Sequence, residues 1–145
     1  MAANSKIAVA THIMATLALK KDEAELVTSN YLGESINTNP VVVRRILSDL
    51  QKAGLVESLA GKSGGARLAK AASQISLQDI YSAVDDGSLF ALNPNEPNKK
   101  CPISCVMRSV LTPIFDNADK ALATQLKRTK LSDVVKEIQA RAHLA

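Results

Sequence analysis

The segment between Asn39 and Gly54 limits the possible fold more than any other part of this 145-residue chain. Asparagine is favoured at a helix N-cap, and the proline that follows, Pro40, suits the first helical position. Glycine suits the residue just past a helix end, because it adopts the left-handed conformation without strain. This punctuation predicts a helix that runs from Asn39 to Ala53.

The predicted helix has one packing stripe and one outward stripe. At 100° per residue, the first stripe contains four aliphatic residues, Val43, Ile46, Leu47 and Leu50. The opposite stripe contains Val41, Arg45, Ser48 and Lys52. We expect the first stripe to be buried in a core and the second to be exposed.

Further helices and one hairpin are predicted on either side of this segment. Apolar residues recur at helical spacing over residues 6–19, and Thr28 or Ser29 can cap a short second helix. Residues 55–68 are typical of a strand, a glycine-rich turn and a second strand. Another short helix is expected over residues 75–84.

Helix, helix, turn, helix and hairpin is the element order of a winged helix-turn-helix. In that fold the third helix enters the major groove of DNA, and the hairpin, or wing, lies beside it on the backbone. The candidate DNA contacts are residues near the helix starts, on the outward stripe and in the wing. They are Lys6, Thr28, Asn37, Thr38, Asn39, Val41, Arg44, Arg45, Ser48, Lys62, Ser63, Gly64 and Arg67.

Two of the candidates on the third helix have a definite chemical role in this hypothesis. Arg45 can bind a guanine edge or a phosphate, and Val41 can contact a thymine methyl group. Arg44 lies off the outward axis, so an ion pair with Glu34 or Asp49 is the alternative to a phosphate contact.

The C-terminal half is predicted to be helical after one irregular loop. Three prolines and three asparagines between Asn93 and Pro102 favour a loop. Apolar residues then recur over residues 104–127, where Pro113 either kinks one helix or starts a new one. A last amphipathic helix is expected over residues 132–142.

Taken together, these motifs resemble the Rrf2 family of bacterial transcription regulators. The matching segments are residues 7–13, 39–47, 52–56, 61–68 and 75–84, and the Cys101-Pro102 pair after the loop. The resemblance implies a mainly α fold, with a winged helix-turn-helix, a small two-stranded wing and a long C-terminal dimerisation helix. It also implies a homodimer built near residues 104–127 that binds a palindromic operator, and a signal sensed after Val84.

The expected organisation has three parts. Residues 1–85 form the DNA-binding domain, residues 86–103 the sensing loop and residues 104–145 the helical dimerisation region. The expected function is a DNA-binding transcription regulator, acting as a repressor on double-stranded DNA. The alternative is an adaptor whose winged helix binds protein without DNA readout, because that fold also serves as an interaction module.

Cys101 and Cys105 are the two cysteines of the chain and the candidates for redox sensing. They stand at the start of a predicted helix, next to Lys99 and Lys100, where positive charge favours the reactive thiolate. A redox switch that responds to an oxidant or a small molecule is one interpretation. The other is that both are small apolar side chains at a dimer interface.

Iron-sulfur members of the family need three cysteines and a nearby histidine in the sensing loop. This chain has two cysteines, and His12 and His143 lie far from them in sequence. We therefore expect no cofactor and no metal site. A cluster completed across a dimer is the alternative that this count leaves open.

The composition of the chain argues against several classes of protein without identifying one. No stretch approaches 18 uncharged apolar residues and no signal-peptide cleavage site follows the N-terminus, so we expect a cytoplasmic protein outside the membrane. The net charge of +4 permits a polyanionic partner without establishing one. Catalytic carboxylate pairs and Ser-His-Asp sets are missing from the pattern, which argues against an enzyme.

Overall fold

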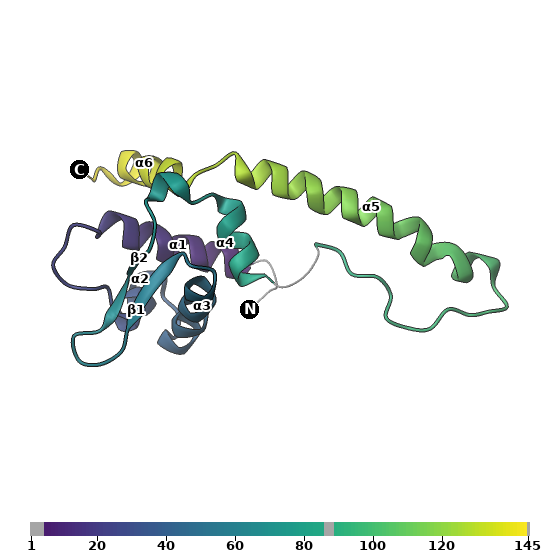
Figure 1. The fold of residues 1–145 in the computed structure, drawn as a ribbon, viewed down its shortest axis with the longest axis horizontal. Helices are drawn as coiled ribbons and strands as arrows, with labels where there is room; N and C mark the ends of the chain where they lie inside the picture. The colour runs from purple at the N-terminus through teal and green to yellow at the C-terminus, as the bar shows by residue number, and fades with distance from the viewer. Residues whose placement is uncertain (1–4, 86–88, 145) are drawn as a thin grey trace.

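The computed structural model of the protein describes residues 5–85 and 89–144 and is mainly helical (Figure 1). The N-terminal elements are α1 (Ser5–Leu19), α2 (Ser29–Ile36), α3 (Pro40–Lys52), β1 (Val56–Leu59) and β2 (Gly65–Leu68). The C-terminal elements are the 3-10 turn η1 (Ala72–Gln74), α4 (Leu77–Val84), α5 (Pro102–Lys127) and α6 (Leu131–Ala142). The predicted winged helix-turn-helix order is confirmed.

Helix α3 starts and ends as its sequence predicts. The Asn39 side-chain oxygen accepts a hydrogen bond from the N–H of Val41 at 2.9 Å, and Pro40 is the first helical residue. Gly54 has a φ of 76°, so the chain turns away from the helix axis there. The four residues of the predicted packing stripe are all buried: Val43, Ile46, Leu47 and Leu50.

The core lies between the N-terminal helices, the hairpin and α4, and it is aliphatic. Ile13, Met14 and Leu17 of α1 pack in it with Leu50 of α3 and Ile80 of α4. Burial of each such side chain contributes about 1.5–3 kcal/mol to folding. The core therefore fixes the position of α3 relative to α1 and leaves its opposite stripe at the surface.

The chain entering α6 is joined to the chain entering α4. The N–H of Leu77 donates to the carbonyl of Thr129 at 2.9 Å, and the N–H of Leu131 donates to the carbonyl of Ile75 at 2.8 Å. Ile75 and Leu131 are fully buried in the core. These bonds hold the C-terminal end of α5 against the N-terminal part.

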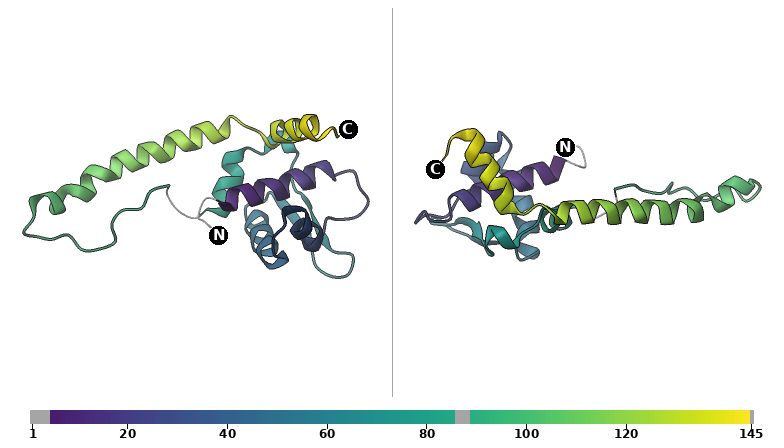
Figure 2. Two further views of the ribbon diagram at one scale, coloured as in Figure 1. Left: turned by 180° about the vertical axis from the view of Figure 1, so that it is seen from behind. Right: turned by 90° about the horizontal axis from the view of Figure 1, so that it is seen from above.

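Helix α5 projects away from the rest of the molecule (Figures 1 and 2). It is one continuous helix of 26 residues that passes through Pro113, which settles the choice between a kinked helix and two helices. None of its residues is buried. Five large apolar side chains of its distal half are exposed, and we call them the apolar face of α5: Ile103, Val106, Met107, Val110 and Ile114.

Among the described residues, no helix combines the length and the apolar character needed to cross a bilayer.

Candidate nucleic-acid interface

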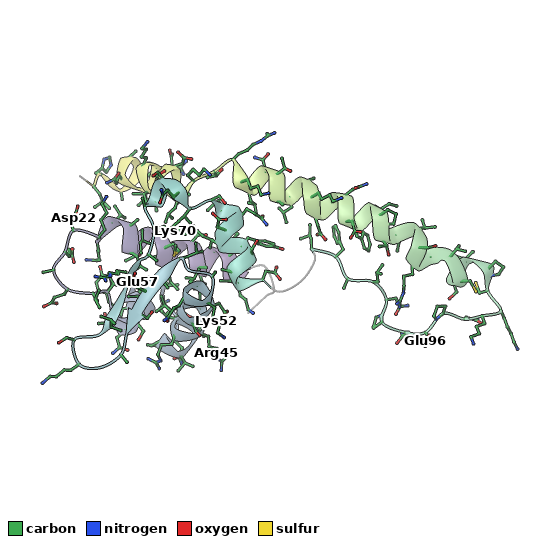
Figure 3. The ribbon with its side chains drawn as sticks, in the orientation of Figure 1. Asp22, Arg45, Lys52, Glu57, Lys70 and Glu96 are labelled. Atoms are coloured by element: carbon green, nitrogen blue, oxygen red, sulfur yellow. The ribbon has the colours of Figure 1, made fainter. Side chains whose placement is uncertain are left out.

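The outward stripe of α3 is exposed, as predicted. Val41, Arg45, Ser48 and Lys52 all face solvent, and Val41 exposes 44% of its surface. Figure 3 shows Arg45 at the free edge of the N-terminal part, on the side of α3 away from the core. The stripe therefore presents a cation, a hydroxyl and a methyl-bearing side chain on one surface.

The Arg44 side chain is directed to α2. Its Nη1 atom donates to the Oγ atom of Ser29, the first residue of α2, at 3.3 Å. In the described part of the chain, neither Glu34 nor Asp49 forms an ion pair with Arg44. The positive charge is thus held beside the start of α2 without being neutralised by a carboxylate.

The turn between α2 and α3 is closely packed, and its polar residues have structural roles. Asn37 has a φ of 59° and ends α2, while the N–H of Thr38 donates to the carbonyl of Gly33 at 2.9 Å. A Cβ atom on Gly33 would lie 2.9 Å from the Thr38 carbonyl oxygen, so glycine permits this approach. The Asn39 oxygen is already used by its capping bond, which leaves the amide NH2 as its free donor.

Lys20 and Tyr31 connect the end of α1 to α2. The Lys20 Nζ atom lies 4.7 Å from the centroid of the Tyr31 ring and 3.2 Å from a carboxylate oxygen of Glu23. The hydrogen bond to Glu23, and then the contact with Tyr31, raise the pKa of Lys20 above its ordinary value of 10.5. These contacts help to fix the start of α2, which Thr28 caps through a 3.1 Å bond to the Tyr31 N–H.

The wing is a two-stranded antiparallel hairpin whose tip contains Lys62, Ser63 and Gly64. Glu57 and Arg67 stand directly opposite each other on its strands, and their side chains form an ion pair of 2.7 Å. The pairing reduces the positive charge that Arg67 offers to a polyanion. Lys62 has no ion pair among the described residues, so it supplies the charge at the wing tip.

A cleft of about 560 Å³ separates α3 from the wing, and we call it the α3–wing cleft. It brings together five of the candidate residues: Thr28, Arg44, Ser48, Lys62 and Gly64. Hydroxyl groups, two cations and a helix start meet in this cleft, which is the chemistry that binds phosphate oxygens. The other eight candidates do not line the cleft: Lys6, Asn37, Thr38, Asn39, Val41, Arg45, Ser63 and Arg67.

Asn30 and Gln51 also line the cleft, although neither is among the candidates predicted from the sequence. Helical spacing could have found Gln51, because it follows Arg44 by seven residues and Ser48 by three and so shares their side of α3. No sequence pattern indicated Asn30, because its place depends on how α2 packs against α3.

The predicted sensing loop folds back along α5 (Figure 1); its residues 86–88 lie outside the described residues. Four contacts are spaced along the helix: Leu89 N–H to Asp119 at 2.9 Å, the Phe90 and Phe115 rings at 5.2 Å, Arg108 to the Asn93 carbonyl at 3.1 Å, and Asn98 N–H to Ser104 at 2.8 Å. The loop and most of α5 therefore form one arm.

Both cysteines are free thiols at the far end of this arm. Cys101 is the N-cap residue of α5 and is half-buried, while Cys105 is exposed one turn later. No group of three or more His, Cys, Asp or Glu side chains in the described part of the chain is placed to hold a metal ion. His12 is bonded instead to Ser35, with its Nε2 atom 3.0 Å from the hydroxyl oxygen.

Sequence comparison identifies the family. The family model for Rrf2, described as an iron-dependent transcriptional regulator, matches residues 3–137. The chain belongs to the Rrf2 family. One of its curated relatives is the "Putative HTH-type transcriptional regulator YwnA" of Bacillus subtilis, which is 38% identical over 136 residues, or 93% of this chain and 98% of the relative. The resemblance noted from the motifs is therefore confirmed.

Solved structures support the Rrf2 fold. A crystal structure described as a putative DNA-binding protein is 35% identical, with a TM-score of 0.70, and the match covers 90% of this chain and 98% of that one. A transcriptional regulator from Lactobacillus plantarum, also described as putative, is 27% identical, with a TM-score of 0.79 and coverages of 93% and 90%. This Rrf2 chain is therefore a transcription regulator of a DNA-binding family and not an enzyme.

Proposed function

We propose that this Rrf2 protein binds a palindromic operator as a homodimer, represses transcription, and changes its DNA affinity when Cys101 is oxidised. The observation that carries DNA binding is the α3–wing cleft, which joins Arg44, Lys62 and Ser29 beside the exposed stripe of α3. In this proposal the stripe enters the major groove and the cleft receives the adjacent backbone phosphates.

The apolar face of α5 supports the homodimer part of the proposal. Ile103, Met107, Val110 and Ile114 are spaced by four, three and four residues, the repeat that forms a seam between two helices. All are at least 43% exposed in the described chain, and soluble monomers rarely leave a contiguous apolar surface of this kind open. A second copy of α5 covers it in the proposed dimer, and the two α3 helices then lie about 34 Å apart, one turn of DNA.

The redox part of the proposal rests on Cys101. It is half-buried at the start of α5, between the folded-back loop and the apolar face. A chemical change at this thiol alters the packing of the arm that forms the proposed dimer, and so alters the distance between the two α3 helices. The bound dimer represses transcription when its operator overlaps a promoter. Oxidation then relieves repression by releasing the dimer from the DNA.

The direct test is a binding titration with labelled DNA from upstream of the protein's own coding sequence. Specific binding should weaken by about 10³-fold or more between roughly 50 and 200 mM salt if six or more phosphates are contacted. Unlabelled DNA of the same sequence should also displace the labelled DNA at a lower concentration than random DNA does. Indifference to DNA at low salt would contradict the proposal and favour the adaptor. A promoter–reporter assay with and without the protein then tests repression.

A further inference from the structure

A pocket of about 270 Å³ lies between the folded-back loop and α5, and Cys101 is one of the residues that line it. We call it the loop pocket. Leu92, Met107 and Leu111 give it apolar walls, and Arg108 and Glu96 supply one charge of each sign. Cys105 is not among its lining residues. The pocket therefore combines a thiol, a cation, an anion and an apolar surface in a small volume.

The charges of the loop pocket are complementary to an amino acid. Arg108 uses Nη2 to bind the Asn93 carbonyl at 3.1 Å, and the described residues provide no hydrogen-bond partner for its other N–H groups. Those donors suit a carboxylate, and the Glu96 carboxylate suits an ammonium group. Neither charge forms an ion pair within the described part of the chain.

An internal disulfide is disfavoured by the geometry of the two cysteines. The N–H of Cys105 donates to the carbonyl of Cys101 at 3.1 Å, as in a regular helical turn. Cβ atoms four residues apart in a helix are about 5–6 Å apart, whereas a disulfide needs about 3.5–4.5 Å. The Cys105 sulfur instead lies 3.7 Å from the carbonyl oxygens of Asn98 and Lys99. A disulfide at Cys101 therefore takes its second sulfur from outside this chain.

The geometry points to the loop pocket as a site where Cys101 exchanges with small disulfides of α-amino acids. This inference rests on the proposed redox function and names its oxidant. The Cys101 thiolate attacks one sulfur of the incoming disulfide, so that a new S–S bond forms and the old one breaks. The departing half leaves as a thiolate and takes up the proton that Cys101 lost. Arg108 binds the carboxylate of the retained half, and Glu96 binds its ammonium group.

The pocket is connected to the apolar face of α5 through shared residues. Ile103 and Met107 line the pocket and also belong to the exposed seam. A retained amino-acid half-molecule presses on these two side chains from the loop side. Adduct formation therefore changes the surface that a second copy of α5 covers.

The test uses the reduced full chain and three disulfides: cystine, cystamine without carboxylates, and dithiodipropionate without ammonium groups. Mass spectrometry of the intact chain and its peptides follows the rate of adduct formation. We expect cystine to react fastest and to form its adduct at Cys101. The adduct should be absent from Cys101→Ser, and Cys105→Ser should react at the rate of the parent chain. Equal rates for all three disulfides, or preferential modification of Cys105, would overturn the inference.

Charge variants test the recognition itself. Arg108→Gln should slow the reaction with cystine and with dithiodipropionate by about tenfold, the effect of one hydrogen bond to a charged group, and leave cystamine unaffected. Arg108→Lys keeps the charge and should react at a rate near that of the parent chain. Glu96→Gln should slow cystine and cystamine but not dithiodipropionate. Circular dichroism of each variant shows whether the arm still folds.

Failure of this inference is distinguishable from failure of the proposed function. The adduct is detected without DNA, and DNA binding of the reduced chain is measured without disulfide. A selective adduct that leaves DNA affinity unchanged would support the pocket and overturn redox regulation. If a different oxidant releases the DNA and the three disulfides form adducts at equal rates, the result would support redox regulation and overturn the pocket.

Discussion

The Nη1 atom of Arg44 lies 3.3 Å from the Oγ atom of Ser29, across the junction between α3 and α2. This contact turns Arg44 away from the outward stripe and toward the α3–wing cleft, which both residues line. Its neighbour Arg45 is exposed and makes no ion pair in the described chain. Adjacent arginines therefore have different surroundings, and we expect them to act on different parts of DNA.

Arg44→Gln should weaken binding to operator and random DNA by similar factors, because a phosphate contact has no sequence information. The slope of log K against log salt should fall by about 0.9, the value for one lost phosphate contact. A fluorescence anisotropy titration at several salt concentrations measures both. Arg44→Lys serves as the control, because it keeps the positive charge and should keep most of the salt dependence. A loss confined to the operator would contradict this assignment.

Arg45→Ala should reduce operator affinity by about 1–3 kcal/mol and affect random DNA much less, as expected for a side chain that binds a base edge. Selection of bound sequences from a randomised pool should show relaxed preference at one position of each half-site. Equal weakening on both kinds of DNA would instead show that Arg45 binds a phosphate.

Asn39→Ala should lower the free energy of unfolding by about 1 kcal/mol, because the Val41 N–H loses its capping acceptor. Asn39→Ser keeps a capping oxygen and should be close to the parent chain in stability. Urea denaturation followed by circular dichroism measures both. If the two variants lose stability equally, the cap is not the source of the effect.

Val110→Asp should convert the dimer to a monomer while preserving the fold, because α5 contributes no buried residue to the core of the described chain. Thr112→Asp adds the same charge about 200° further around α5 and should leave the dimer intact. Sedimentation velocity at matched concentrations distinguishes the two states. A parent chain that sediments as a monomer at high concentration would refute the dimer.

Gly64→Ala should destabilise the wing by about 1–3 kcal/mol, the usual cost of overpacking. A Cβ atom at this position would overlap the carbonyl oxygen of Leu59, which belongs to the backbone and cannot move aside cheaply. DNA affinity should fall with it, whereas Ser63→Ala at the same tip should keep the hairpin. Hydrogen exchange of the wing amides measures the loss of stability. Unaltered protection of these amides in Gly64→Ala would contradict the prediction.

The sequence was sufficient where structure depends on neighbouring residues. The ends of α3, the presence of α4 and the position of the hairpin all follow from local hydrogen bonds and backbone preferences, such as the capping box that Ser76 and Asp79 form at the start of α4. The buried stripe of α3 follows from helical periodicity alone.

The sequence was insufficient where structure depends on distant partners. The Arg44 contact with Ser29 spans 15 residues, and the Leu89 contact with Asp119 spans 30. The Glu57–Arg67 pair depends on the strand register, which the glycine-rich turn left undefined. Pro113 was ambiguous because its effect on a helix depends on how the surrounding turns are stabilised.

The bonds that join Leu77 to Thr129 and Leu131 to Ile75 make the root of α5 stiff, and this stiffness has a mechanical consequence. A 26-residue helix is about 39 Å long at 1.5 Å per residue, so a tilt of roughly 5° at its root displaces the far tip by about 3 Å. The same lever works in reverse. In the proposed dimer, a small displacement at the tip, where Cys101 lies, would turn the N-terminal part as one body and shift α3 along the DNA axis.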